Sequence, residues 1–476
     1  MAAECTTEGM DRAAIVRSFT RLAAAASLLL VFAFSSACGS PVPETPPPPT
    51  ARPAVERAPG GRPVDPSAVR TRAQPSILDT LGNIDDTPEP AVRAPNDAVG
   101  QVASPATLDL AAPPHGCVAI TRSPTRVLSA GGPASITATP SGFVVAGYAA
   151  SPAGETVVAV RLSPSSPTLP LATLALGPAS STPRVAPPMV AALDNGRVLV
   201  AAMDARGSLR AIALGLSSPT LSPALRTIGS GADLRFAPAI AALRGGASVV
   251  AYTDGSGTPM RVKLVVLLPD VRTAATHDVT PESLGASAPV FDVLAEVPEL
   301  VFLDARGGLS PIVRVALAEN GTPRAPQIDR PLSTVSEPAH IATAHLGPRR
   351  FVAYTAIGRA ATSAIGVVEL GGTLPVEPLV SGEGYGVLQL GAASAPAAAI
   401  FAVTWPAPGV AATARFNGQL LVRLVDTAGI GPPFAVTSPE ERVSHAAIAR
   451  AEDGTIGVAY TTAAGVDVQW LRCADR

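Results

Sequence analysis

The sequence predicts an all-β protein: a seven-bladed β-propeller of about 50-residue, four-stranded blades, preceded by a disordered tether. Three observations predict this fold: a repeat period near 50 residues, short apolar runs separated by glycine turns, and an incomplete last repeat. The period is clearest at Asp204, Asp254 and Asp304, which lie 50 residues apart, each just after a short apolar run. Two of these aspartates open the same Asp-Ala-Arg-Gly turn. The repeat region is therefore expected to consist of equivalent units.

The first 37 residues have the character of a targeting segment. Basic residues precede an apolar stretch, 22–34, that is too short for a typical transmembrane helix, and three small residues then precede Cys38. This pattern resembles a bacterial lipoprotein signal, although a serine stands where that family usually has leucine. The resemblance implies that Cys38 carries lipid and anchors the protein in the cell envelope, with Gly39 favouring the outer membrane. An ordinary cleaved signal peptide is the alternative, and Met10 is an alternative start.

Residues 38–115 are predicted to be a proline-rich tether. Prolines run from 46–49 through Pro105 among Ala, Arg and Asp. Such a stretch cannot bury enough apolar surface to offset the entropy lost on ordering. A flexible coil of this length spans about 50 Å root-mean-square. The expected division is a signal peptide at 1–37, the tether at 38–115 and the propeller at 116–476.

Each repeat unit has four parts that we expect to be strands. A small-residue strand such as 189–193 comes first, and a tight glycine turn joins it to an apolar run. A polar turn leads to a third strand, for example 261–266, and a weaker fourth strand such as 226–228 ends the unit. The second strands of the seven copies end at Tyr148, Met203, Tyr252, Leu303, Tyr354, Trp405 and Tyr460. Four short antiparallel strands per unit are typical of a propeller blade.

The two ends of the repeat region predict how the ring closes. The last unit ends after three strands, at 466–472, and the segment 126–128 is available as its missing fourth strand. In an exported protein, Cys117 and Cys473 are expected to form a disulfide, with two unpaired thiols as the alternative. The bridge would replace a missing covalent hairpin and stabilise the fold by up to about 5 kcal/mol.

Composition and motifs give little indication of chemistry. The formal net charge is −2 and 15% of the residues are charged, which does not favour a nucleic-acid partner. The sequence has no Gly-x-Ser-x-Gly elbow, His-Glu-x-x-His motif, Walker loop or Asp-x-Asp-x-Asp-Gly calcium loop. We therefore expect neither a cofactor nor a metal site.

One face of the predicted propeller carries the candidate ligand residues. The loops before the first strands (the leading loops) and the turns between second and third strands share this face around the channel, and we call it the leading face. Its predicted residues in the leading loops are Arg184, Arg235, Arg442, Glu337, His340 and His445. The turns add Asp204, Asp254, Asp304, Arg206, Arg306 and Arg359.

Two interpretations of these charged residues remain open. Converging arginines could clamp a carboxylate or phosphate, or Arg and Asp of neighbouring blades could pair and cap turns. For the repeated aspartates the sequence favours capping, because a turn at a fixed place in each blade suits a hydrogen bond from an Asp side chain. The arginine cluster resembles the carboxylate clamp of sialidase-type propellers. The Ser-x-Asp-x-Gly-x-x-Trp boxes of that family are absent.

The sequence favours a non-catalytic binding or scaffolding module. It would be a monomer anchored to the membrane through Cys38, and it would contact an envelope protein or a glycan through one propeller face. One alternative is a glycan-processing hydrolase or lyase with a sialidase-like propeller. Another is a structural component of the envelope.

Overall fold

The structure is a computed structural model of the whole chain. It describes residues 116–129, 132–151, 154–178, 185–217, 225–280, 285–293, 297–304, 311–330, 340–357, 362–372, 377–383, 390–406, 418–438 and 440–473. All of them belong to one compact unit, Asp86–Arg476, whereas a second unit, Met1–Asp85, contains no described residue. The predicted signal segment, Cys38 and the tether therefore lie outside the described residues. In the described part of the chain, we find no helix with the length and hydropathy that a membrane span requires.

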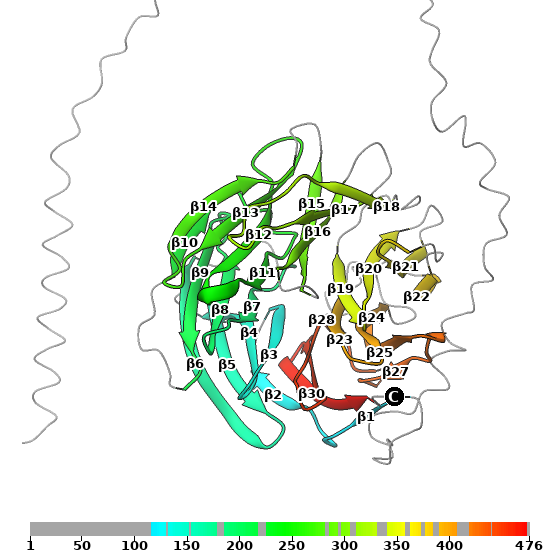
Figure 1. Cartoon of the computed structure of the whole chain (residues 1–476). Coiled ribbons are helices and arrows are strands. Elements are labelled where there is room, and N and C mark those ends of the chain that lie inside the picture. Colours follow the sequence, from blue (N-terminus) through cyan, green and yellow to red (C-terminus); the bar gives the residue numbers. More distant parts are fainter. Residues whose placement is uncertain are drawn as a thin grey trace, which may run out of the picture. The chain divides into compact units, whose positions relative to one another are not determined.

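The described residues form five four-stranded antiparallel sheets and one ten-stranded sheet (Figure 1). The first sheet contains β3 (Ala134–Thr139), β4 (Gly142–Ser151), β5 (Gly154–Ser163) and β6 (Ser166–Gly177). The second contains β7 (Met189–Ala192), β8 (Arg197–Met203), β9 (Leu209–Gly215) and β10 (Arg226–Gly229). The third contains β11 (Ala239–Ala242), β12 (Ser248–Asp254), β13 (Arg261–Leu267) and β14 (Thr273–Asp278), with a 3-10 turn at Arg244–Gly246.

The remaining sheets follow the same strand order. The fourth contains β15 (Ala286–Asp292), β16 (Glu299–Asp304), β17 (Ile312–Ala316) and β18 (Gln327–Arg330). The fifth contains β19 (Ile341–Leu346), β20 (Arg349–Ile357), β21 (Thr362–Glu369) and β22 (Glu377–Glu383). The ten-stranded sheet begins with β23 (Leu390–Ser394), β24 (Ala399–Pro406), β25 (Gly418–Asp426), β26 (Gly429–Ile430) and β27 (Phe434–Ala435). It continues with β28 (Val443–Arg450), β29 (Thr455–Thr462), β30 (Gly465–Cys473), β1 (Cys117–Ala119) and β2 (Thr125–Leu128).

The ten-stranded sheet consists of two halves that meet at one point. One half is β23 to β27, and the other is β28 to β30 with β1 and β2. The pairing between β25 and β28 that joins them is Gly418 opposite Val443. Each half thus has the same antiparallel order as the four-stranded sheets.

The core lies between consecutive sheets, which explains the apolar second strands. All seven residues of β12 are buried, because neighbouring sheets cover both faces of this strand, and its central residues Val249–Tyr252 are apolar or aromatic. In β4 the faces alternate, as strand geometry requires. Val144 and Tyr148 pack with Val198 of the second sheet, whereas Phe143 packs with Trp470 of β30.

The first strands of the sheets contact one another in a closed series. The contacting pairs are β3–β7, β7–β11, β11–β15, β15–β19, β19–β23, β23–β28 and β28–β3. The coloured sheets of Figure 1 follow this order from cyan to red. Four-stranded sheets whose first strands meet around a common centre make a β-propeller.

The N-terminal strand closes the last sheet as predicted. In β2, Arg126 lies opposite Asp467 and Leu128 opposite Val466 of β30. The indole N–H of Trp470 donates to Thr125 Oγ1 at 3.0 Å. The sequence did not predict β1 as a strand of its own, yet it continues the pairing along β30 and places Cys117 opposite Cys473.

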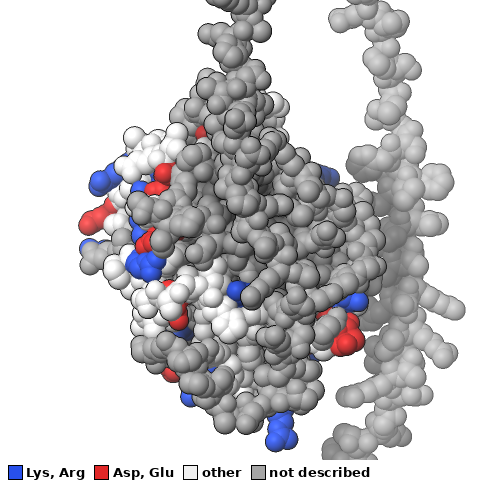
Figure 2. Space-filling view, turned by 90° about the vertical axis from the view of Figure 1, so that its right-hand side faces the viewer, with Lys and Arg blue, Asp and Glu red and all other residues white. Residues whose placement is uncertain are grey.

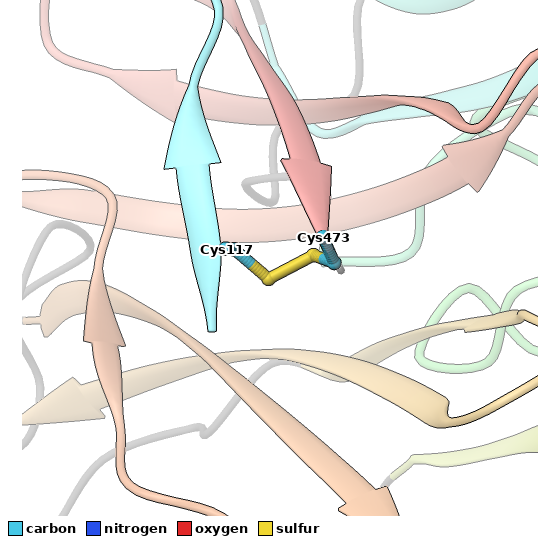
Figure 3. Close-up of a disulfide and its surroundings, with 2 residues drawn as sticks. All are labelled: Cys117 and Cys473. Atoms are coloured by element: carbon cyan, nitrogen blue, oxygen red, sulfur yellow. A yellow bond between two sulfur atoms is a disulfide. The ribbon is translucent and has the colours of Figure 1, made fainter. Parts of the chain in front are cut away.

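The predicted disulfide between Cys117 and Cys473 is confirmed (Figure 3). It joins the first and last strands of the described chain across 356 residues of sequence. Gly465, at the start of β30, allows the neighbouring strand to approach: its φ is 139°, and a Cβ there would collide with the carbonyl oxygen of Leu128. A glycine is therefore required where β2 docks.

Candidate functional site

The predicted ligand residues are described in part. Arg235, His340, Arg442 and His445 are described, and their surroundings follow below. Outside the described residues lie Arg184, Glu337, Arg306 and Arg359. Among the described residues there is no group of three or more His, Cys, Asp or Glu side chains placed to hold a metal ion.

Arg235 pairs with a carboxylate of its own leading loop. Its Nη2 lies 2.7 Å from Asp233 Oδ2, and its guanidinium lies 5.4 Å from the ring centre of Phe236. Burial acts to raise the pKa of Asp233, but the hydrogen bonds and charge of Arg235 outweigh it and lower the pKa. The Arg235 side chain is nevertheless 66% exposed, so it remains accessible to a partner.

His340 is held against the neighbouring strand by its backbone. Its N–H donates to Thr355 Oγ1 at 3.2 Å, and its carbonyl accepts from the Thr355 N–H at 3.1 Å. Burial lowers the pKa of His340 to about 4, because the charged imidazolium would lose its hydration. His340 is therefore neutral at pH 7.

Two of the repeated aspartates cap turns. Asp204 Oδ1 accepts from the N–H groups of Arg206 and Ser208, both at 2.9 Å. Asp254 Oδ1 accepts from the N–H of Ser256 at 3.0 Å. The capping interpretation is confirmed for these two residues. Asp304 is fully buried, and its N–H donates to the Pro311 carbonyl at 3.0 Å.

The ionic partners of these aspartates differ from the expected ones. Asp204 Oδ2 lies 2.9 Å from Arg210 Nη2, and Asp254 pairs with Lys263. Both partners come from the next strand of the same sheet and not from a neighbouring blade. Burial acts to raise the pKa of both aspartates, but hydrogen bonds and the adjacent cations lower it. Each of these two ion pairs thus fixes its turn from within its own sheet.

The start of β28 gathers several polar side chains. The register of β28 against β29 shifts between Val443 and His445, which leaves Ser444 without a cross-strand partner. A β-bulge of this kind re-aims side chains that would otherwise point to opposite faces. Ser444 Oγ and His445 Nδ1 consequently lie 2.9 Å apart, and both residues are 6% exposed.

His445 also connects the last sheet to the loop before the second. Its Nε2 lies 2.6 Å from the carbonyl oxygen of Val185. A carbonyl oxygen can only accept, so Nε2 carries a proton, and in a neutral ring Nδ1 would accept from the Ser444 hydroxyl. The same loop is held by Ser135, whose Oγ donates to the Pro188 carbonyl at 2.6 Å. The predicted residue His445 thus lies at a junction of three sheets.

Arg442 and Glu441 precede this bulge. Arg442 Nη1 is buried and has no hydrogen-bond partner among the described residues. Burial raises the pKa of Glu441, and the charge of Asp467 raises it further. Asp467 itself is bound by Arg126, with Nε to Oδ1 at 2.5 Å. Glu441 therefore holds a proton more readily than an exposed glutamate does.

A second charged group joins the fourth and fifth sheets at the opposite ends of their first strands. Asp292, almost fully buried, lies with Oδ1 2.6 Å from His345 Nε2 and Oδ2 2.5 Å from Arg350 Nε. Arg350 also pairs with Glu299. On the face shown in Figure 2, described acidic and basic side chains likewise lie beside one another at several places. The Asp292 group fixes the fourth and fifth sheets relative to each other.

Sequence reasoning missed Glu441, Ser444 and Asp467 as candidates. The Arg126–Asp467 pair follows from the predicted pairing of 126–128 with the last strand, so it could have been found. The contact of Ser444 with His445 could not, because adjacent residues of a regular strand point to opposite faces. The bulge that brings them together has no marker in the sequence.

No protein-family model matches this chain, and no curated protein matches it either. Solved structures similar to it include a polysaccharide lyase, with 8% identity over 72% of this chain and 90% of the other, at a TM-score of 0.47. A lectin from Burkholderia pseudomallei has 16% identity over 72% and 98%, at a TM-score of 0.43. An intramolecular trans-sialidase from Ruminococcus gnavus has 10% identity over 73% and 96%, at 0.40. At such identities no residue role can be transferred.

Proposed function

We propose that this chain is a seven-bladed propeller acting as a binding module of the cell envelope. The blade count is supported by the hydrophobic clusters of the described residues, seven in number, each between two consecutive units. The closed series of first-strand contacts supports it as well. The two halves of the ten-stranded sheet are then the sixth and seventh blades, and the protein is a monomer.

The ligand, an envelope protein or a glycan, binds to the leading face. One observation supports this proposal above the others: two turns of the leading face are held in place before any ligand binds. Asp204 and Asp254 cap these turns and form ion pairs within their own sheets. A surface whose turns are fixed beforehand loses less conformational entropy when it binds. Arg235 stays exposed on it and offers a planar, charged contact to a carboxylate or carbonyl group.

A matched pair of arginines tests which face binds. Arg235 is 66% exposed and pairs with Asp233, whereas Arg272, at the opposite end of the third sheet, is 65% exposed and pairs with Asp270. The purified protein is first screened on a glycan array and by envelope pull-down. We then expect Arg235→Ala to weaken binding to the captured ligand about tenfold, as for loss of one charged hydrogen bond, and Arg272→Ala to leave it unchanged.

The test contradicts the proposal in two cases. If neither screen captures a ligand, the binding function is wrong. If Arg272→Ala weakens binding as much as Arg235→Ala, the leading face is not the binding face. Isothermal titration calorimetry of both variants against the captured ligand measures the difference.

We propose further that the protein is exported and held to the membrane, in the outer membrane by preference, by lipid on Cys38. The Cys117–Cys473 disulfide supports export, because such bonds persist in oxidising compartments. We expect Cys38→Ser to move the protein from the membrane fraction to the soluble fraction of cells. A variant that stays with the membranes as the unmodified protein does would contradict the anchor.

A further inference from the structure

We propose that Ser444 is a nucleophile for acyl transfer, with His445 as its general base, and that the protein hydrolyses a carboxylic ester at the start of β28. This activity goes beyond the proposed binding function. It rests on the contact between Ser444 Oγ and His445 Nδ1, at 2.9 Å. A serine hydroxyl is a weak nucleophile unless an adjacent base takes its proton, and this distance is within reach for that transfer.

The imidazole of His445 is oriented by a third group. Its Nε2 donates to the Val185 carbonyl at 2.6 Å, which favours the tautomer whose Nδ1 carries no proton and can take the proton of Ser444. When Nδ1 becomes protonated, the same carbonyl stabilises the positive ring. A nucleophile, a base and a group that orients the base form the arrangement that activates serine on unrelated folds.

A donor for the negative charge of the reaction precedes the bulge in the chain. Ser444 is the extra residue of the β28–β29 register. Two residues earlier, Arg442 Nη1 is buried without a hydrogen-bond partner among the described residues. Donors of this kind stabilise the oxyanion of a tetrahedral intermediate, above all in a site that is 6% exposed.

The reaction proceeds in two balanced steps. Ser444 Oγ forms a bond to the ester carbonyl carbon while its proton moves to His445 Nδ1. The bond from that carbon to the alkoxy oxygen then breaks, and the leaving alcohol takes the proton. Water adds to the acyl carbon with its proton passing to Nδ1, after which the bond to Ser444 Oγ breaks and the serine recovers the proton.

The test is covalent labelling of the full-length protein by a fluorophosphonate. We expect intact-mass analysis to show one adduct, and peptide mapping to place it on Ser444. Hydrolysis of p-nitrophenyl acetate should accompany it. His445→Gln, which removes the base, should slow both labelling and hydrolysis at least about 100-fold. Ser444→Ala should abolish the adduct.

Ser248→Ala is the matched control. Ser248 is buried as Ser444 is, at 2% exposed, but it lies in β12 of the third sheet. We expect this variant to be labelled at the rate of the unmodified protein. Peptide mapping of the adduct is done on the unmodified protein, so the assignment to Ser444 does not depend on whether a variant folds. Absence of an adduct on Ser444, or equal labelling of His445→Gln, overturns the proposal and leaves the binding function standing.

Discussion

Replacing Cys117 and Cys473 together by alanine is expected to lower the free energy of unfolding by about 2–5 kcal/mol. The bridge spans 356 residues of sequence, so its removal frees a very long loop in the unfolded chain. The bridge also holds β1 against β30. Because β2 follows β1 in the chain, it helps to hold β2 as well, and the two strands together complete the edge of the last sheet. Loss of this edge strand would expose β30 to solvent.

Chemical denaturation of the oxidised protein and of the double variant measures the difference. Addition of reductant should bring the unmodified protein to the stability of the variant and should leave the variant unchanged. An oxidised protein that unfolds at the same denaturant concentration as the variant would show that the bridge contributes nothing.

The second large effect is expected at the buried carboxylate between the fourth and fifth sheets. Asp292→Ala removes the acceptor of His345 Nε2 and Arg350 Nε. Arg350 keeps its pair with Glu299, but His345 and Arg350 lose their buried carboxylate, and we expect a loss of about 3–5 kcal/mol, as for removal of one partner of a buried ion pair. Asp270→Ala is the control, because Asp270 pairs with Arg272 at the surface and its removal should have a far smaller effect. Similar losses for both variants, in denaturant titrations, would contradict the prediction.

The contribution of Asp292 should also depend on pH. Burial acts to raise the pKa of Asp292, but the hydrogen bond and charge of His345 and the charge of Arg350 outweigh it and lower the pKa. A folded-state pKa below the unfolded value, about 3.9, means that folding favours the ionised carboxylate. Its stabilisation is complete above about pH 4 and is lost as the pH falls further. The difference in stability between the unmodified protein and Asp292→Ala should therefore shrink as the pH falls below about 4, and a constant difference would count against the prediction.

Much of the fold could be predicted because the repeat is visible locally. The recurring aspartates and the glycine turns fix the period, and the unfinished last unit points to 126–128 as its partner. The disulfide follows from the same closure. The separate strand β1 was missed because its three residues, Cys-Val-Ala, are too short a run to show an alternation of polar and apolar residues in the sequence.

Less of the candidate site could be predicted, because its contacts depend on how sheets pack. Asp292 and His345 lie on the first strands of different sheets, so no sequence spacing indicates that they touch. Ser444 and His445 meet only because of a register shift, and His445 reaches Val185 across 260 residues. Arg235, by contrast, pairs two residues away, which a turn pattern can suggest.

Both limits of the described part of the chain lie on the edge formed by β30 and its two short partners. The position at which the described chain enters and leaves the ring is therefore set by connectivity alone, and the ring itself has no intrinsic first sheet. A circular permutant that links residue 473 to residue 117 and opens an exposed hairpin elsewhere would preserve every strand pairing. A protein fused at residue 117 or at residue 473 would likewise be attached at the outer edge of the last sheet, next to β30.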